Sequence, residues 1–166
     1  MLILARSMGS LRFGELAQVY EQSLKEAASD YSRYPSGLAM QMAELDFRQY
    51  FQEVFFPTEG ALCALWEVNG HYVSALRLEP YRDGLLLEGL ETAPEQRHRG
   101  YGAALIQAVL GTLPCGKVYS HVRKANAISR KTHEKCGFRQ ISDSAVYIDG
   151  SVDRRCCTFV YEIEAT

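Results

Sequence analysis

The sequence predicts a single α/β (α+β) domain, with a mixed, mostly antiparallel sheet of about seven strands and about four helices around it. Its 166 residues, 47% of them hydrophobic, are enough for one domain with a full core. Strand-like runs separated by Asn-Gly and Asp-Gly alternate with segments of helical periodicity. One strand–helix–strand unit makes two strands parallel, so the sheet is mixed. We expect residues 1–166 to form this one domain.

The first half of the chain predicts a strand, two helices and a three-stranded meander. Apolar residues recur at helical spacing in both helices, and Asn69-Gly70 and Asp83-Gly84 are typical hairpin turns. The predicted elements are a strand over 2–5, helices over 11–28 and 38–55, and strands over 61–68, 71–79 and 85–92.

The second half predicts two helices and three strands. Pro114 ends the first of these helices, Gly137 ends the second, and Asp149-Gly150 predicts a final hairpin. The third meander strand, the helix after it and the following strand form the parallel unit. The predicted elements are a helix over 100–113, a strand over 117–122, a helix over 126–136, and strands over 138–148 and 154–164.

Composition argues against several classes of location and site. The apolar run at the start of the sequence, Leu2 to Ala5, is too short for a secretory or membrane segment, so we expect a cytoplasmic protein. Five cysteines, an odd number without C-x-x-C spacing, argue against a disulfide framework and a zinc site. The four histidines lack the carboxylate spacing of metal ligands, so we expect no metal.

Positive charge is concentrated in one segment. Residues 96–136 contain eight Lys or Arg and one acidic residue, a net charge of +7, whereas the rest of the chain carries −9. Such a segment suggests a polyanionic partner, either a phosphorylated cofactor or nucleic acid, although charge alone fits a solvated face equally well. Nucleic acid is disfavoured, because the positive residues are not interleaved with exposed aromatic residues and the overall charge is −2.

The segment PEQRHRGYGAALIQ, residues 94–107, predicts a phosphate-binding loop. It connects a central strand to a helix, where unpaired N–H groups and the helix dipole favour an anion. Gly100 and Gly102 let a phosphate approach the main chain, and Arg97 and Arg99 add positive charge. The alternative is a tight turn into a helix. The segment is neither a P-loop nor a dinucleotide fingerprint, because G-K-[ST] is absent and position 105 is leucine.

Two motifs resemble the GNAT superfamily of N-acetyltransferases. Residues 97–102, RHRGYG, are similar to the family's acetyl-coenzyme A signature Q/R-x-x-G-x-G/A. Residues 126–138, NAISRKTHEKCGF, are similar to the family's N-x-x-(A/S)-x-x-x-Y-x-x-x-G-F block. The order of predicted elements also matches this family, although the first third of the chain matches by architecture only. The positions in register in the second block are Asn126, Ser129, Gly137 and Phe138.

The resemblance implies acetyl-CoA as the cosubstrate. In this family the loop wraps the pyrophosphate with its main-chain amides, and two parallel strands splay apart to admit the pantetheine arm. By position, the arm would pair with the main chain at Leu90 and Thr92. Asn126 matches a residue that bonds the arm, and an N-cap for the following helix is an equally reasonable role. The implied cofactor-binding residues are Leu90, Thr92, Arg97, His98, Arg99, Gly100, Tyr101, Gly102, Ala103, Asn126 and Ser129.

The resemblance also implies direct attack of a primary amine on the thioester, which requires a base and an acid. Glu88 is the predicted base, because strand alternation places it on the face of Leu90 and Thr92. Flanking leucines should raise its pKa through desolvation. The alternatives are a buried salt bridge to an arginine or a bulge that redirects the side chain. Glu91 is the second choice for the base.

His133 is the predicted acid. It occupies a position where the family most often has tyrosine, and imidazole can also donate a proton to the leaving sulfur. The alternative is a helix residue that merely faces the cofactor. His98, in the loop, and His121, at the end of a strand, are weaker candidates.

The acceptor is not specified by the sequence. The resemblance places its pocket among the early helices and the last hairpin, where tyrosines and acidic residues suit a cationic amine, although core packing also explains the tyrosines. We expect a small-molecule or peptide amine as partner, with a homodimer as a candidate assembly, and neither nucleic acid nor a membrane. Polyamine, amino acid, aminoglycoside and protein amino terminus all remain open. The alternative function is a non-catalytic acyl-CoA sensor, which the missing tyrosine favours.

Overall fold

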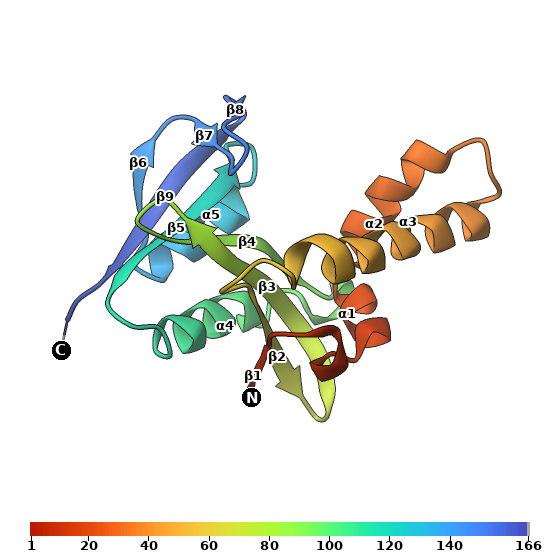
Figure 1. The fold of residues 1–166 in the computed structure, drawn as a ribbon, viewed down its shortest axis with the longest axis horizontal. Helices are drawn as coiled ribbons and strands as arrows, with labels where there is room; N and C mark the ends of the chain where they lie inside the picture. The colour runs from red at the N-terminus through yellow and green to blue at the C-terminus, as the bar shows by residue number, and fades with distance from the viewer. Residues whose placement is uncertain (166) are drawn as a thin grey trace.

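The computed structural model describes residues 1–165, which form a seven-stranded sheet with helices on both faces (Figure 1). In spatial order the strands are β1 (Leu2–Ala5), β2 (Leu62–Val68), β3 (His71–Tyr81), β4 (Gly84–Thr92), β5 (Gly116–Arg123), β9 (Cys156–Ile163) and β6 (Arg139–Ser142). β4 and β5 are parallel, and the other neighbours are antiparallel. The predicted mixed sheet of seven strands with one parallel pair is therefore confirmed.

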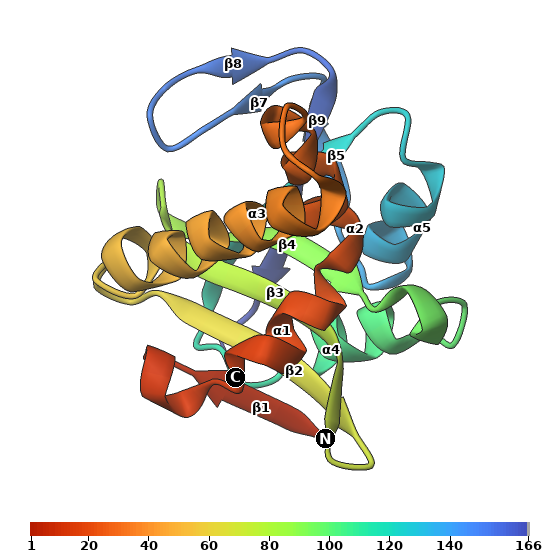
Figure 2. The same ribbon diagram turned by 90° about the vertical axis from the view of Figure 1, so that its right-hand side faces the viewer.

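Five α-helices cover the two faces of the sheet. α1 (Phe13–Val19), α2 (Glu21–Ala27) and α3 (Ser36–Tyr50) lie over one face, and α4 (Tyr101–Leu110) and α5 (Ala127–Lys135) lie over the other (Figure 2). We call the two sides of the sheet the α1–α3 face and the α4–α5 face. Each face buries its own apolar cluster between the helices and the sheet. Within residues 1–165, none of the helices has the length and apolarity needed to cross a bilayer.

The first predicted helix is two helices. The sequence predicts one helix over 11–28, but the chain bends at Tyr20, whose φ and ψ of −90° and 18° separate α1 from α2. The Tyr20 side chain is buried, and its hydroxyl donates a hydrogen bond to the main-chain oxygen of Gly89 at 2.5 Å. The bend keeps this ring on the sheet while the chain changes direction, and it raises the number of helices from the predicted four to five.

The second predicted helix, over 38–55, is α3 followed by a π-helical turn. This turn spans Phe51–Phe55, and both of these phenylalanines are fully buried on the α1–α3 face. Single π-helical turns are rare and occur often at functional sites. Here the turn brings two aromatic rings toward the middle of β3.

The hairpin turns of the meander are confirmed at one position and shifted at the other. Asn69 and Gly70 both have positive φ, at 51° and 80°, as the predicted turn requires. The Asp83-Gly84 turn is wrong by one residue, because Tyr81 pairs with Gly84 and leaves Arg82 and Asp83 as the turn. Gly84 instead begins β4, where a Cβ atom would lie 2.1 Å from the carbonyl oxygen of Lys117 in β5. Glycine is needed there for the close approach of the parallel strands.

The predicted strand over 138–148 is interrupted, whereas the predicted strand over 154–164 is the continuous strand β9. The segment 138–148 contains β6 and then, after a break, β7 (Ala145–Val146), which pairs with β8 (Val152–Asp153) in a small separate sheet. The Asp149-Gly150 turn is confirmed within this hairpin, where Gly150 has a φ of 85°. Figure 1 shows the β7–β8 hairpin beyond one end of the main sheet.

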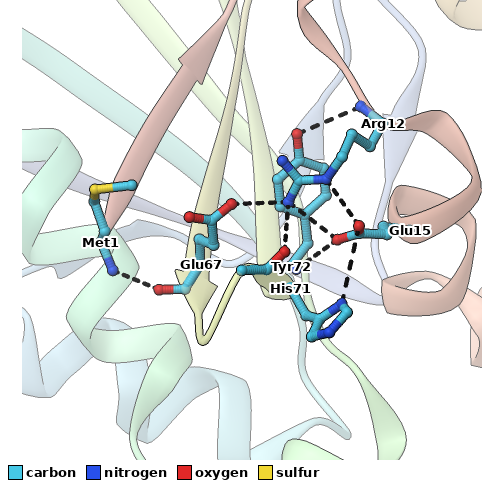
Figure 3. A network of polar contacts seen from close by, with 7 residues as sticks. Met1, Arg12, Glu15, Glu67, His71 and Tyr72 are labelled. Atoms are coloured by element: carbon cyan, nitrogen blue, oxygen red, sulfur yellow. Dashed lines mark hydrogen bonds and ion pairs between the residues drawn. The ribbon is translucent and has the colours of Figure 1, made fainter.

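A polar network fixes α1 to the hairpin between β2 and β3 (Figure 3). The Arg12 guanidinium donates to Glu15 and to Glu67, each at 2.8 Å, and the N–H of Tyr72 donates to Glu15 at 3.0 Å. The amino group of Met1 donates to the main-chain oxygen of Glu67 at 2.6 Å. These bonds hold α1 across the sheet. Tyr20, the residue that follows α1, can therefore reach Gly89 in β4.

Candidate active site

β4 and β5 separate in the middle of the sheet. Their parallel ladder extends from Gly84 and Lys117 to Leu87 and Ser120, although β4 itself continues for five more residues. The remaining edge of β4 has no strand partner on this side among the described residues. We call the opening between the two diverging strands the fork. Its unpaired main-chain groups can accept an extended ligand.

A β-bulge at Gly89 changes the faces of β4. Arg77 of β3 pairs with Glu88, and the residue two positions before Arg77 pairs with Glu91, so three positions of β4 correspond to two of β3. Gly89 has a φ of 59°, which favours glycine. The predicted alternation is therefore wrong. Glu88 and Glu91 share the α1–α3 face, whereas Leu90 packs in the apolar cluster of the α4–α5 face.

Glu88 lies beside a buried arginine, as one of the sequence-based alternatives proposed. The Nε atom of Arg77 is 3.8 Å from Oε1 of Glu88, and both atoms are buried with no hydrogen-bond partner among the described residues. Burial raises the pKa of Glu88 to about 7; Arg77 acts against this shift, and Glu79 adds to it. A carboxyl group with this pKa can take up and release a proton near neutral pH.

Aromatic rings enclose Arg77. Its guanidinium carbon lies 5.4–6.0 Å from four ring centroids, and its side chain is 16% exposed. The faces of aromatic rings attract a cation. The rings therefore hold the guanidinium of Arg77 next to Glu88, although Arg77 Nε and Glu88 Oε1 form no hydrogen bond with each other. Arg77 is not among the residues predicted from the sequence, although an arginine inside an otherwise apolar stretch of a strand was a usable signal. The rings belong to Tyr20, Tyr50, Phe51 and Phe55.

Glu91 is a second carboxylate on the same face. Its Oε1 atom accepts a hydrogen bond from the hydroxyl of Ser23 in α2 at 2.8 Å, and its Oε2 atom is buried with no partner among the described residues. Burial raises the pKa of Glu91, and the bond from Ser23 opposes this shift. Glu91 is thus tied to α2, whereas the Glu88 carboxylate accepts no hydrogen bond at its buried oxygen.

The predicted phosphate loop is exposed. His98 and Gly100 have positive φ values of 62° and 79°, and α4 begins at the next residue, Tyr101. Within residues 1–165, no main-chain N–H from Arg97 to Ala103 donates to a protein acceptor. The loop therefore presents several N–H groups at the positive end of α4, an arrangement that favours an anion.

The loop lies at the end of β4, beside the fork. The Nε atom of Arg97 donates to the main-chain oxygen of Thr92 at 3.2 Å. A Cβ atom on Gly102 would lie 3.7 Å from the Thr92 hydroxyl and 3.9 Å from the Leu90 side chain. The structure therefore brings Leu90, Thr92 and the first turn of α4 together.

The positive charges of the loop remain available. Lys117 pairs with Asp83 at 2.7 Å, and Lys124 pairs with Asp143 at 3.1 Å, so these cations are balanced by acids from outside the positive segment. Arg97 and Arg99 form no ion pair with any described residue, and both are exposed. A groove of about 700 Å³ between α1 and α3 contains none of the predicted site residues. In the described part of the chain, no group of three or more His, Cys, Asp or Glu is placed to hold a metal ion.

Asn126 caps α5. Its side-chain oxygen accepts a hydrogen bond from the N–H of Ser129 at 3.0 Å, so the N-cap role is confirmed. The end of α5 is close to the start of α4, because the Cys136 thiol lies 3.7 Å from the main-chain oxygen of Ala103. Contact of Asn126 and Ser129 with a ligand stays a prediction.

His133 is buried on the α4–α5 face, with 2% of its surface exposed. Its Nδ1 atom donates to the carbonyl of Ser129 at 2.8 Å, which leaves Nε2 to accept from the Ser120 hydroxyl at 2.9 Å. Burial lowers the pKa of His133, so the ring is neutral at neutral pH. Its role as an acid stays a prediction. In this arrangement it would act only through Ser120, and it lies on the opposite face from Glu88.

We expect the burial of His133 to lower the free energy of unfolding at acidic pH. Its folded-state pKa lies below the unfolded value of about 6.5, so the unfolded state binds more protons below that pH. The free energy of unfolding should therefore fall as pH decreases from about 6.5 through the folded pKa. Urea unfolding of the wild type and His133→Phe at several pH values measures this effect. The free energy of unfolding should decline less with falling pH in His133→Phe than in the wild type. His71→Gln, which replaces an exposed histidine, is the control and should decline like the wild type. Equal declines in all three proteins would contradict the prediction.

Comparisons with known proteins agree with this geometry. A family model described as "Acetyltransferase (GNAT) family" matches residues 21–138. No curated protein sequence matches the chain. The structure resembles the ribosomal-protein-S18-alanine N-acetyltransferase of Escherichia coli (18% identity, TM-score 0.61, 100% of this chain and 96% of that one). It also resembles the PaiA N-acetyltransferase of Thermoplasma acidophilum, solved with coenzyme A (14%, 0.59, 98% and 99%). A third similar structure is a chimera of the spermidine N-acetyltransferase SpeG from Vibrio cholerae and hSSAT (16%, 0.51, 74% and 75%).

Proposed function

Because the chain belongs to the GNAT family of acetyltransferases, we propose that it transfers an acetyl group from acetyl-CoA to a primary amine, with residues 1–166 as one domain. One observation carries this proposal: the fork opens beside a loop whose N–H groups have no acceptor among residues 1–165. Acetyl-CoA has a long arm with amide groups and a diphosphate. It therefore requires an unpaired strand edge next to an anion site, and the two features lie side by side here.

The residues at the fork fit this cosubstrate, which supplies an acetyl group activated as a thioester. The diphosphate would bind the main-chain N–H groups from Arg97 to Ala103, with the Arg97 and Arg99 side chains adding charge. The arm would pair with the main chain at Leu90 and Thr92. The amide nitrogen of Asn126 and the hydroxyl of Ser129 are further donors on α5, since the Asn126 oxygen already caps the helix.

Glu88 is the proposed base. A primary amine enters as an ammonium ion and must lose a proton before it attacks the thioester carbon. Glu88 suits this step because its pKa of about 7 lets it accept the proton, directly or through water, at neutral pH. Its carboxylate belongs to the α1–α3 face, so we propose that the amine approaches from that side.

The proposed acceptor is a small-molecule or peptide amine. The structurally similar proteins named above act on an alanine of ribosomal protein S18 and on spermidine, both of which supply amines. Two half-buried carboxylates, Glu88 and Glu91, against one half-buried cation, Arg77, favour a positively charged acceptor on the α1–α3 face. We further propose a cytoplasmic location and keep a homodimer as a candidate assembly.

A second candidate function is a non-catalytic acyl-CoA sensor. One observation favours it: both ring nitrogens of His133 are bonded within the protein, so the residue at the family's tyrosine position has no free donor. A sensor would bind acetyl-CoA without releasing CoA when amines are added.

Thermal-shift titration tests the cosubstrate. CoA and acetyl-CoA should raise the melting temperature, because a ligand specific for the folded state stabilises it. We expect Arg97→Ala combined with Arg99→Ala to weaken CoA binding by roughly tenfold, about 1.4 kcal/mol, and to reduce its salt dependence. Lys117→Ala is the matched control, because this cation already pairs with Asp83. Equal affinities of the double variant and the control would contradict the proposed loop.

Release of CoA thiol distinguishes an enzyme from a sensor. The assay uses acetyl-CoA with spermidine, lysine and a peptide that begins with alanine. Amine-dependent thiol release in any arm supports acetyl transfer. Binding of acetyl-CoA without thiol release in every arm supports the sensor.

A further inference from the structure

His121 and Glu88 occupy equivalent positions on the two strands of the fork. Leu87 and Ser120 form the last pair of the parallel ladder, so Glu88 and His121 are the first residues beyond it on the two strands. The Ser120 side chain points to His133 on the α4–α5 face, and His121 therefore points to the opposite face. Glu88 lies on that same face, since it pairs with Arg77. The two side chains thus occupy the start of the fork on the α1–α3 face.

The surroundings of His121 define its tautomer. Its ring stands perpendicular to those of Tyr81 and Tyr147, at centroid distances of 5.5 and 5.3 Å. The Tyr81 hydroxyl donates to the main-chain oxygen of Val146, so the weak 3.4 Å contact to His121 requires a proton on Nε2. Nδ1 then carries a lone pair, and it has no hydrogen-bond partner among the described residues.

The charges around His121 keep the ring neutral. Burial lowers its pKa, and the nearby Arg82 lowers it further. The other titratable groups on this side include Glu79 and Tyr81 of β3, Glu88 of β4, Tyr119 of β5 and Tyr147, whose hydroxyl donates to Asp153 at 3.2 Å. A neutral imidazole with a free lone pair can accept a proton, and its conjugate acid gives the proton up readily because its pKa is low.

Acetyl transfer removes two protons from the amine nitrogen. As the C–N bond forms and the C–S bond breaks, the nitrogen that entered as an ammonium loses two protons, and the sulfur gains one. Glu88, the proposed base, takes the first proton and releases it to water. The second leaves the attacking nitrogen as the leaving sulfur gains a proton, and His133 lies on the opposite face from Glu88 with both ring nitrogens bonded within the protein.

We propose that His121 is a catalytic residue that takes the second proton from the attacking nitrogen and delivers it to the leaving sulfur. This inference rests on the proposed acetyl transfer. The ring begins and ends each cycle neutral, so no other reactant is needed. His121 is a weaker candidate from the sequence because it lies at the end of a predicted strand; the strand register adds that it follows the last paired residue of β5 on the face that carries Glu88.

Proton NMR of the histidine rings tests the placement without turnover. The chain has four histidines, and the His121 signal is the one that disappears in His121→Gln. CoA should change the shift and the pKa of His121, whereas desulfo-CoA, which lacks the sulfur, should leave the pKa unchanged. The buried His133 should titrate alike with both ligands. An identical His121 response to CoA and desulfo-CoA would overturn the proposal.

Kinetics tests the proton transfer. With the best amine of the panel, His121→Gln should lower kcat by about 100-fold and leave the KM for acetyl-CoA within about twofold. Tyr81→Phe removes the hydroxyl bonded to the β7–β8 hairpin and keeps the imidazole, so it should lose less activity. Equal losses in the two variants, or a kcat within about twofold of wild type in His121→Gln, would refute the role of His121. No turnover in the wild type would instead contradict the proposed function itself.

Discussion

Glu88→Gln is expected to lower kcat/KM by about 100- to 1000-fold while leaving the Kd for CoA unchanged. Glutamine keeps the size of the side chain and cannot accept the proton of the ammonium. The wild-type rate should rise with pH through about 7, where Glu88 loses its proton, and this ionisation should be absent from the variant. Steady-state rates across this pH range, together with CoA titration, measure both effects.

Glu91→Gln is the matched control for this experiment. Glu91 lies on the same face of the same strand, and burial also raises its pKa, but its carboxylate is bonded to Ser23 of α2. We expect this variant to retain the ionisation near pH 7 and to change the acceptor KM more than kcat. If Glu91→Gln loses the ionisation and Glu88→Gln keeps it, then the base is Glu91.

Gly89→Ala is expected to destabilise the protein and to disrupt the site together. At the φ of 59° an alanine costs about 1–2 kcal/mol. Its Cβ atom would also lie 2.6 Å from a guanidinium nitrogen of Arg77, which four aromatic rings hold in place. Overpacking of this kind adds about 1–3 kcal/mol. Displacement of Arg77 should also move the ionisation of Glu88 upward, because the arginine lowers that pKa.

Gly70→Ala separates the two causes. Gly70 has a similar positive φ of 80°, and no heavy atom lies within 4 Å of its ideal Cβ position. The control should therefore show the backbone cost alone, with unchanged activity. Urea unfolding and the pH dependence of the rate measure the two variants. Equal losses of stability, with no change in the ionisation of Glu88, would show that Arg77 does not restrain the bulge.

The meander, the parallel pair and the loop could be predicted from sequence, because their signals are local. Asn69-Gly70 defines a hairpin by itself, and the helix after RHRGYG requires the crossover that makes β4 and β5 parallel. The N-cap role of Asn126 could be predicted for the same reason, because the N–H group that its side chain bonds belongs to Ser129, three residues further along the chain. These features depend on neighbours in the sequence.

The faces of the site could not be predicted, because they depend on contacts distant in sequence. Simple alternation placed Glu88 with Leu90, and the bulge at Gly89 separated them. A glycine inside a strand is a signal for a bulge, but it does not say on which side the extra residue falls. The bend at Tyr20 depends on a bond to a residue 69 positions away. Propensity cannot reveal such a contact.

The four aromatic rings around Arg77 have a consequence for the end of each proposed catalytic cycle. Without a nearby cation, a carboxyl group buried on this face would keep its proton. It could then not accept a proton from the next amine. The fixed cation stabilises the ionised carboxylate and brings the pKa back to about 7, so uptake and release of the proton are nearly isoenergetic in neutral solution. The four rings and the arginine that they hold would therefore return Glu88, the proposed base, to its ionised form between turnovers.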